Sequence, residues 1–313
     1  MRTSKRAADE HTLVVITGPT AVGKTSVSID IAQRLNTEIV SADSRQFYKE
    51  LKIGTAAPGL DELHRLKHHF VGHLSIQDPC NASDFEHHAL KVIEGIFEKN
   101  KFCIATGGSG LYIDALWRGF DNLPPACDAT RNRIENVFAN EGIVGLRLWL
   151  KRLDPVYYTQ VDLANPNRIK RAIEVTLTTG TPFSQLRTHR VIPRPFHIRF
   201  VVLERPRHEL FERINQRVDQ MVQEGLIEEV LQLYRFKHLN ALNTVGYKEL
   251  FEWLSGGGCS LQQAIENIKT NTRRFAKRQI TWFRRYPDAL WVHPDNVDEI
   301  IKWIEPYNSP QLR

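Results

Sequence analysis

Four short apolar runs, separated by longer segments with helical spacing, dominate the hydrophobic pattern of this chain. The runs at 13–17, 101–106 and 196–203 are rich in β-branched and other apolar side chains, which is typical of buried parallel strands. A fourth run, at 38–44, begins apolar and ends in polar residues. Because helices are predicted between these runs, the pattern indicates an α/β fold with a parallel sheet core flanked by helices.

Helices are predicted wherever apolar residues recur every three or four positions. Ser83 and Asp84 are expected to open one of them, as N-cap and first-turn acid. Two others are separated by Gly225, and a last short strand is expected at 289–292. The helices predicted for this part of the chain are 25–35, 83–97, 111–117, 207–224, 226–236 and 260–285.

The middle of the chain lacks any strand-like run, and Pro124-Pro125 marks its beginning. Apolar spacing predicts helices at 131–139, 142–153 and 167–179, the last ending at Gly180. We therefore predict an all-helical insertion in the α/β fold. The predicted organisation is a flexible N-terminus at 1–11, an α/β core formed by 12–118 and 195–313, and a helical insertion at 119–194.

The segment after the first predicted strand has the spacing of a phosphate-binding P-loop, Gly18-x4-Gly23-Lys24-Thr25. In such a loop, consecutive backbone N–H groups form a nest for phosphate oxygens beside a helix N-terminus. Lys24 adds a full positive charge, and the Thr25 hydroxyl can hold Mg²⁺. The motif predicts a diphosphate or triphosphate ligand and leaves its identity open. The predicted phosphate-binding residues are Gly18, Pro19, Thr20, Ala21, Val22, Gly23, Lys24 and Thr25.

Polar residues also follow two other predicted strands. Asp43 ends the second strand, and the glycine-rich turn at 107–110 ends the third. Ligands of parallel α/β proteins gather at the carboxyl ends of strands, so both are expected to face the crevice of the P-loop. Asp43 could ligate magnesium through water or act as a general base. The alternative is an ordinary turn or helix-capping aspartate.

Charge favours an anionic partner without proving one. The chain has 42 Lys and Arg against 36 Asp and Glu, a net charge of +6 and a pI near 9.1. Basic residues are dense at 168–171, and they alternate with aromatic residues at 273–285, which suits nucleic acid. The alternative for the second segment is an amphipathic helix that packs Phe275, Ile280 and Phe283 inward. Four dispersed cysteines, without a membrane span or a cleavage site, lead us to expect a cytoplasmic protein.

Arg213 and Arg217 lie four residues apart on a predicted helix. Either could turn toward the P-loop and neutralise charge on a departing phosphate. The alternative is a surface salt bridge with Glu209 or Glu212.

Seven segments, in order along the chain, resemble the signatures of the tRNA dimethylallyltransferase family. The resemblance runs from about residue 12 to residue 286. It departs from the family at Ala57, where a Lys is usual, and at Ser109, where a Thr is more frequent. The segments are 18–25, 41–48, 53–56, 107–112, 167–174, 245–247 and 276–284.

The resemblance implies a P-loop NTPase-like fold and prenyl transfer to tRNA. The donor would be dimethylallyl diphosphate, and the acceptor N6 of the adenosine just 3′ of the anticodon, in tRNAs reading codons that begin with U. The product would be N6-(dimethylallyl)adenosine. Asp43 would be the general base, while Lys24, Thr25 with Mg²⁺, and Arg217 would act at the diphosphate.

The same resemblance implies which residues hold the anticodon stem-loop of the tRNA, with Ser109 near the flipped base. The apolar run near the N-terminus is too short for a membrane span, so we expect no membrane contact, and we expect a monomer. The implied tRNA-binding residues are Asp43, Ser44, Arg45, Gln46, Ser109, Asn167, Arg168, Ile169, Lys170, Arg171, Asn243, Thr244, Val245, Gly246, Tyr247 and Lys248.

Three other functions remain open at this stage. A small-molecule or nucleoside kinase would share the P-loop and the aspartate, and would consume ATP without RNA. An adenylate prenyltransferase would act on a free nucleotide. A non-catalytic RNA-binding protein would retain only the phosphate pocket.

Overall fold

The computed structural model describes residues 11–121, 123–124, 127–188 and 190–305. The chain divides into two compact units, one formed by residues 1–117 with 194–313 and the other by residues 118–193. This division lies within one residue of the predicted boundaries. The predicted flexible N-terminus lies outside the described residues except for His11, whose ring stacks on Phe97 with centroids 4.8 Å apart.

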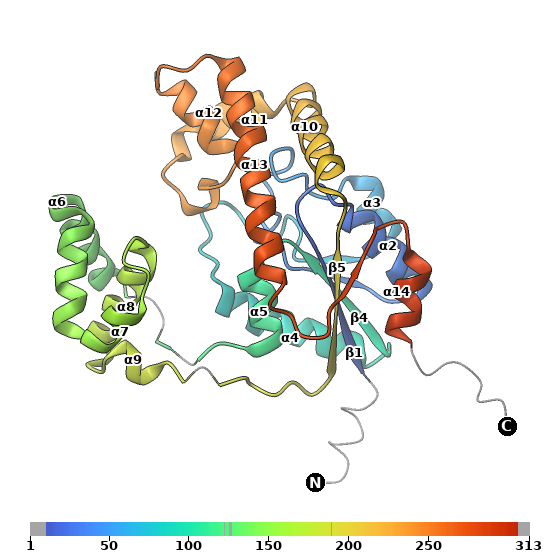
Figure 1. The fold of residues 1–313 in the computed structure, drawn as a ribbon, viewed down its shortest axis with the longest axis horizontal. Coiled ribbons are helices and arrows are strands. Elements are labelled where there is room, and N and C mark those ends of the chain that lie inside the picture. The colour runs from blue at the N-terminus through green and yellow to red at the C-terminus, as the bar shows by residue number, and fades with distance from the viewer. Residues whose placement is uncertain (1–10, 122, 125–126, 189, 306–313) are drawn as a thin grey trace, which may run out of the picture. The chain divides into compact units, whose positions relative to one another are not determined.

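The first unit contains a six-stranded, fully parallel sheet with the order β3-β2-β4-β1-β5-β6, drawn in Figure 1. The central strand β1 pairs with β4 and with β5, and Thr17 at its end lies beside Gly107 and Val202. The P-loop therefore leaves the sheet at its middle, where ligands of such sheets bind. The strands are β1 (Thr12–Thr17), β2 (Ile39–Ser41), β3 (His68–His69), β4 (Phe102–Gly107), β5 (His197–Leu203) and β6 (Leu290–Val292).

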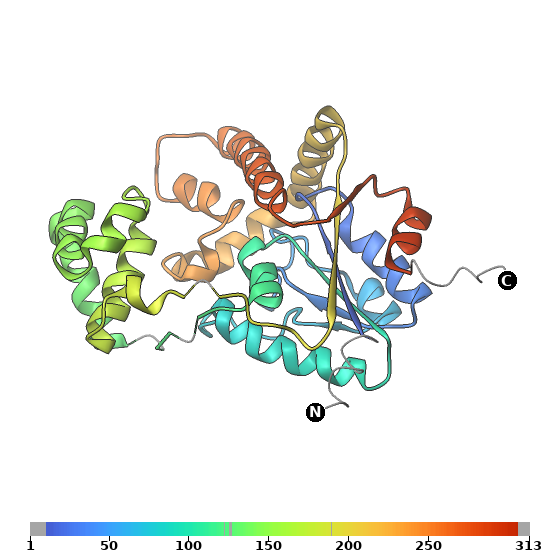
Figure 2. The same ribbon diagram turned by 60° about the horizontal axis from the view of Figure 1, so that its bottom comes forward.

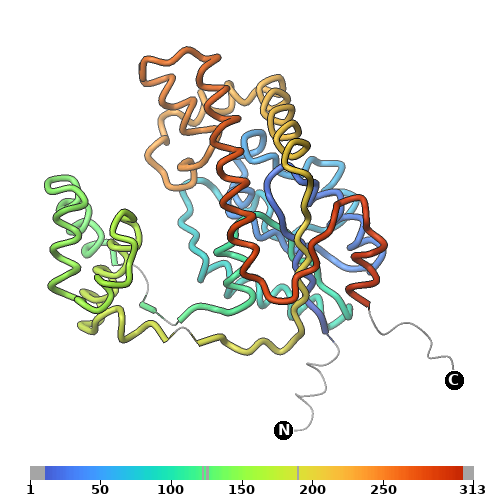
Figure 3. Tube along the Cα trace, in the orientation of Figure 1, coloured from blue at the N-terminus to red at the C-terminus, as the bar shows by residue number. Residues whose placement is uncertain are grey.

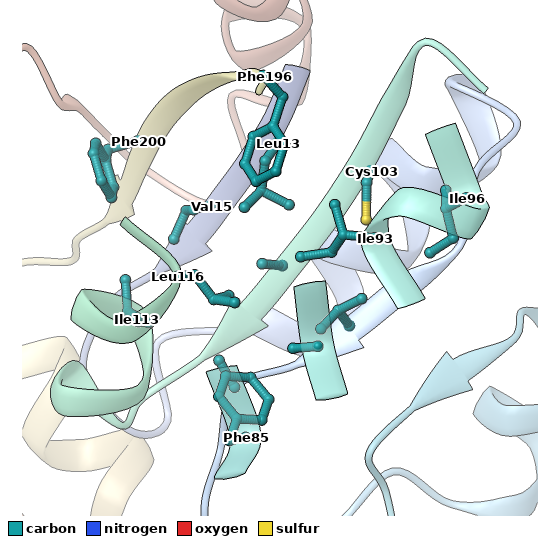
Figure 4. Close-up of a cluster of buried hydrophobic side chains, with 14 of the residues drawn as sticks. Leu13, Val15, Phe85, Ile93, Ile96, Cys103, Ile113, Leu116, Phe196 and Phe200 are labelled. Carbon is teal, nitrogen blue, oxygen red and sulfur yellow. The ribbon is translucent and has the colours of Figure 1, made fainter. Parts of the chain in front are cut away.

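Helices cover both faces of this sheet, because both faces of each central strand are apolar. On one face, α4 (Ala82–Phe97) and α5 (Gly110–Arg118) pack on β1, β4 and β5. Figure 4 shows side chains of these two helices in one cluster with Leu13 and Val15 of β1 and Cys103 of β4. On the other face lie α2 (Lys24–Arg34) and α14 (Val297–Ile304), which Figure 1 shows on the opposite side of the strands.

A second apolar cluster of the same unit is formed by helices beyond the strand ends. It joins α10, α11, α12 and α13 to Tyr48, Leu51 and Ile76, so these helices are fixed to the segment that follows β2. Figure 2 shows α10 and α13 next to each other. The helices are α3 (Leu60–Arg65), α10 (Arg207–Gln223), α11 (Leu226–Leu233), α12 (Tyr247–Leu254) and α13 (Leu261–Phe283), with 3₁₀ turns at Tyr234–Phe236 and Asn240–Leu242.

Among the described residues of the second unit, the regular elements are all helices, and the unit has its own apolar core. The chain enters it after α5 and leaves it before β5, as the tube in Figure 3 shows. Asp154 is fully buried and its carboxylate accepts three hydrogen bonds, two from Ser184 and one from the Tyr157 N–H. The helices are α6 (Asp128–Leu153), α7 (Pro155–Gln160), α8 (Pro166–Thr179) and α9 (Phe183–Leu186).

The predicted α/β class is confirmed, with corrections to individual elements. The second strand is shorter than predicted, so Asp43 lies two residues beyond its end. Asn81, not Ser83, is the N-cap of α4, because its side chain accepts from the Ser83 and Asp84 N–H groups. The two helices expected at 131–153 form one element with a break at Gly142 (φ 63°, ψ −156°). The short elements β3, α3, α7, α9 and α14 were not predicted.

No helix within the described ranges combines the length and the apolar character that a membrane crossing requires.

Candidate active site

A cleft of about 1020 Å³ lies at the carboxyl ends of β1, β2 and β4. One wall is the P-loop, and another is formed by residues 43–46 and the glycine-rich turn after β4. Residues from α10, the 243–248 segment and α13 complete the lining. The structure thus brings together four of the predicted site segments in one unit: the P-loop, residues 43–46, the glycine-rich turn and residues 243–248. The volume exceeds what a small diphosphate alone would fill and is at the upper end for ligand sites.

The P-loop adopts a backbone that its glycines make possible. Gly18 has φ 149° and Gly23 has φ 113°, values that side chains with a Cβ oppose. A Cβ on Gly18 would also lie only 2.6 Å from the Leu203 carbonyl oxygen of β5. Ala21 is in the left-handed region as well, at φ 64°. The loop therefore passes close to the sheet before it enters α2.

Cationic side chains hold four carbonyl groups of the P-loop. Lys24 Nζ donates to the Gly18 and Pro19 oxygens at 3.0 and 2.9 Å. Arg213 Nε donates to the Ala21 oxygen and Arg205 Nε to the Val22 oxygen, both at 2.9 Å. Two amides of the loop are engaged as well, since the Thr20 N–H donates to the Gln279 side-chain oxygen and the Val22 N–H to the Pro19 oxygen. These contacts fix the loop at the N-terminus of α2, where the positive end of the helix dipole favours an anion.

Lys24, Arg217 and Asp43 share one electrostatic environment in the cleft. Burial lowers the pKa of Lys24 to about 8, with the nearby Asp43 acting against this shift and Arg217 adding to it. Burial also lowers the pKa of Arg217, and the Asp43 charge again opposes that shift. Arg217 has no hydrogen-bond or ion-pair partner of its own among the residues that the structure describes. A bound diphosphate would provide the missing counter-charge for both cations.

The two predicted arginines therefore have different positions. Arg213 is exposed and its Nε is engaged with the P-loop backbone, whereas Arg217, one turn later on α10, is partly buried and in the field of Asp43. The carboxylate lies above the glycine-rich turn, since a Cβ built on Gly108 would be 3.7 Å from Asp43 Oδ2.

The segment after β2 is fixed from three sides. Asp43 Oδ1 accepts from the Arg45 N–H at 3.1 Å, and the Ser44 N–H donates to Ser109 Oγ at 3.0 Å. The Arg45 guanidinium donates to the Asn240 and Ala241 carbonyls at 2.8 and 3.1 Å. These contacts tie Asp43 both to the end of β4 and to the loop before α12.

Glu229 on α11 is a positioning residue that no sequence motif indicated. Its carboxylate accepts from the N–H groups of Lys52, Ile53 and Gly54 at 2.9–3.0 Å, and from the Tyr247 hydroxyl at 2.6 Å. Burial and the Glu229 charge raise the pKa of Tyr247. Gly54 is needed beneath Tyr247, because a Cβ there would lie 2.6 Å from its ring.

The 243–248 segment differs in exposure along its length. Asn243 and Lys248 are exposed, whereas Gly246 and Tyr247 are buried, so Tyr247 supports the segment from below.

On α13, Phe283 belongs to the core, as the alternative of an amphipathic helix predicts, while Phe275 is 37% exposed and lines the cleft. Gln279 and Trp282 of the same helix also face the cleft and contact the glycine-rich turn.

Residues 167–171 belong to the helical unit, where they open α8. Ile169 is fully buried in its apolar core, so its side chain is not available to a partner. Lys170 pairs with Glu135, and Arg171 with the buried Glu174. Asn167 and Arg168 are exposed. The surface that this segment offers is therefore smaller than its sequence suggests.

Comparison with known proteins identifies the family. A family model described as IPP transferase matches residues 46–286. The chain belongs to the IPP transferase family. The P-loop precedes the matched residues, but relatives of this family align with it as well. The tRNA dimethylallyltransferase 1 of Phocaeicola vulgatus is 46% identical over 297 residues, 95% of this chain and 99% of the relative. The tRNA dimethylallyltransferase of Christiangramia forsetii is 47% identical over 294 residues, 94% and 97% of the two chains.

Solved structures of IPP transferases share the fold. The tRNA isopentenylpyrophosphate transferase of Bacillus halodurans superposes with a TM-score of 0.69 at 34% identity, covering 95% of this chain and 96% of the other. A eukaryotic dimethylallyltransferase acting on tRNA gives a TM-score of 0.77 at 25% identity, covering 97% and 82%. The predicted family and the P-loop NTPase-like fold are confirmed.

Proposed function

We propose that this IPP transferase moves the dimethylallyl group from dimethylallyl diphosphate to N6 of the adenosine 3′ of the anticodon in tRNA. The observation that carries the proposal is the shared cleft. Lys24 of the P-loop and Arg217 line this cleft together with Asp43, which follows β2. The relatives named above, which align over nearly the whole chain, support the same reaction.

The cleft separates the two halves of the chemistry. In the reaction the allylic C–O bond breaks, and the diphosphate leaves with the electron pair. The adenine N6 forms the new C–N bond and loses a proton to Asp43. Backbone amides of the P-loop, Lys24 and Arg217 stabilise the charge that develops on the diphosphate, which is commonly the largest catalytic contribution. Asp43 supplies general-base assistance, typically about 10²–10⁴-fold.

Mg²⁺ fits the donor set of this site. The Thr25 hydroxyl stands at the first turn of α2, beside the P-loop, and the Asp43 carboxylate lines the same cleft. No group of three or more His, Cys, Asp or Glu that could hold a metal occurs in the part of the chain that the structure describes. Mg²⁺ commonly takes few protein ligands and completes its shell with phosphate oxygens and water. When bound, it would add positive charge at the leaving diphosphate.

The proposed acceptor is the anticodon stem-loop of those tRNAs that read codons beginning with U. The adenine has to leave its stack to reach a cleft of this kind. Ser44, Arg45, Gln46 and Ser109 line the cleft beside Asp43, as do Asn243–Gly246 and Lys248. In the helical unit, the exposed Asn167 and Arg168 would contact the RNA backbone. We propose a cytoplasmic monomer.

The product assay tests this proposal. Purified protein, Mg²⁺ and labelled dimethylallyl diphosphate are incubated with unmodified tRNA, and the RNA is then digested to nucleosides. Label is expected on N6 of adenosine. Parallel reactions contain free adenosine monophosphate, or ATP without RNA. Label on the free nucleotide, or transfer of phosphate from ATP, would replace the proposal by one of the alternative functions.

The lowered pKa of Lys24 predicts how the reaction depends on pH. Because the folded-state pKa is about 8, Lys24 is charged below pH 8 and loses its proton above it in the free enzyme. Loss of that charge weakens the hold on the diphosphate. We therefore expect kcat/KM for dimethylallyl diphosphate, measured at saturating tRNA, to fall about tenfold per pH unit above pH 8.

Lys24→Arg is the control for this profile, because a guanidinium keeps its proton throughout the range. It is expected to be slower than the wild type, since Arg cannot reproduce the contacts of Lys24 with the Gly18 and Pro19 carbonyls. Its kcat/KM should nevertheless lose the decline above pH 8. A wild-type profile that stays level to pH 9.5 would contradict the assignment.

A further inference from the structure

Gln279 spans the two halves of the cleft, and we propose that it is a positioning residue that fixes the donor site relative to the acceptor site. The inference rests on the proposed function and deepens it. Gln279 lies on α13 and is 5% exposed. Its side-chain oxygen accepts from the Thr20 N–H of the P-loop at 2.9 Å, and its side-chain nitrogen donates to the Gly108 carbonyl at 2.9 Å.

These two hydrogen bonds define the orientation of the amide. The Thr20 partner is a donor and the Gly108 partner is an acceptor, so the Gln279 oxygen and nitrogen can be assigned in only one way. A glutamate could not donate to the carbonyl, and an asparagine has one methylene fewer. An amide with the reach of glutamine is therefore required.

The two hydrogen bonds of Gln279 lie beyond the point where the sheet connects the P-loop to the glycine-rich turn. The parallel pairing of β1 with β4 ends at Thr17 and Gly107. Beyond this point the P-loop turns into α2 and the glycine-rich turn enters α5. Gln279 joins the two segments past the strand ends, so their separation does not depend on the sheet alone. The close approach leaves no space for a side chain on the turn, as a Cβ on Gly108 would lie 2.4 Å from the Gln279 nitrogen.

Further hydrogen bonds connect the glycine-rich turn to the segment of Asp43, the proposed general base. Ser109, next to Gly108, accepts from the Ser44 N–H at 3.0 Å, and Ser44 follows Asp43. A continuous path of short contacts thus leads from the P-loop through Gln279 and the glycine-rich turn to Asp43. Trp282, one turn after Gln279, packs against Gly110, where a Cβ would lie 2.3 Å from its ring. Both side chains of α13 therefore hold the same turn.

This placement predicts a specific catalytic effect. Gln279 sets where the diphosphate is held relative to Asp43 and the adenine, so its loss should affect the reaction more than the binding of either substrate alone. A misplacement of reacting groups by about 1 Å can cost about 100-fold in rate. We expect Gln279→Leu to lower the single-turnover rate of prenyl transfer about 10- to 100-fold. The dissociation constants of dimethylallyl diphosphate and of tRNA, each measured alone, should stay within about threefold of wild type.

Gln279→Glu separates positioning from a general loss of structure. It keeps the acceptor for Thr20 but places a negative charge beside the P-loop. We expect it to raise KM for dimethylallyl diphosphate more than tenfold, whereas Gln279→Leu acts on kcat. Gln263→Leu is the matched control, because Gln263 is an exposed residue of the same helix whose side chain hydrogen-bonds, within the described residues, to Asn267 alone. This control should have wild-type kinetics.

The outcomes distinguish the inference from the function on which it rests. If wild-type protein transfers no prenyl group to tRNA, the proposed function is wrong. Gln279→Leu is measured at a temperature where thermal unfolding shows that it is folded. If wild type is active and this variant has an unchanged rate, Gln279 is not a positioning residue. A uniform loss in both variants that follows the folded fraction would also overturn the inference. If Gln279→Leu does not fold, the KM of Gln279→Glu decides: a value within threefold of wild type overturns it.

Discussion

Asp43→Asn is expected to lower the rate of prenyl transfer by about 10²–10⁴-fold, the usual contribution of a general base. Asparagine keeps the acceptor oxygen that Asp43 offers to the Arg45 N–H at 3.1 Å, so the segment after β2 should keep its conformation. It removes the group that takes the proton of the adenine N6. The rate is measured as single-turnover transfer of labelled dimethylallyl to tRNA, and the affinity for tRNA is measured separately.

Affinity for tRNA should stay within a few fold of wild type, because the contacts of Ser44 and Arg45 with Ser109, Asn240 and Ala241 do not involve the Asp43 carboxylate. Asp288→Asn is the matched control, since Asp288 is exposed and asparagine tolerates its left-handed backbone, φ 51°. If Asp43→Asn retained more than a tenth of the wild-type rate, proton transfer to this carboxylate would not be part of the rate-limiting chemistry.

Much of the core was predictable because local patterns determine it. β1, β4 and β5 are continuous apolar runs and were placed within about one residue, since strands with both faces buried have an unambiguous composition. The P-loop could be predicted for a related reason. Its function depends on backbone conformation, and the glycines that permit φ 149° and φ 113° are visible in the sequence.

The remaining features depend on tertiary contacts that no local pattern encodes. β3 has only two residues, His68 and His69, and is a strand because it pairs with β2. Glu229 and Gln279 are ordinary polar residues on their helices, and only the fold shows that one supports the Gly54 loop and the other joins two strand ends. Ile169 lies within a basic stretch, yet the packing of α8 buries it. The roles of such residues depend on the side chains and backbone groups that the fold brings next to them.

The roles of Arg213 and Arg217 show the same limit, and they lead to the second large effect. The sequence does not distinguish the two arginines, which lie four residues apart on one helix. In the structure, Arg217 is in the electrostatic field of Asp43 and has no hydrogen-bond or ion-pair partner in the described part of the chain. We expect Arg217→Ala to lower kcat by about 10²–10³-fold, as the removal of one group that stabilises developing charge does. Arg217→Lys should recover part of this rate, because it restores the charge without the planar fork.

Arg213→Ala is the internal comparison on the same helix. Its guanidinium holds the Ala21 carbonyl and so acts on the shape of the P-loop instead of on the substrate. Its loss should chiefly raise KM for dimethylallyl diphosphate, by about tenfold, with kcat within about threefold of wild type. The reverse result, with the large kcat effect at Arg213 and a KM effect at Arg217, would show that α10 presents Arg213 to the diphosphate when the substrates are bound. The two arginines would then exchange roles between the free and the bound cleft.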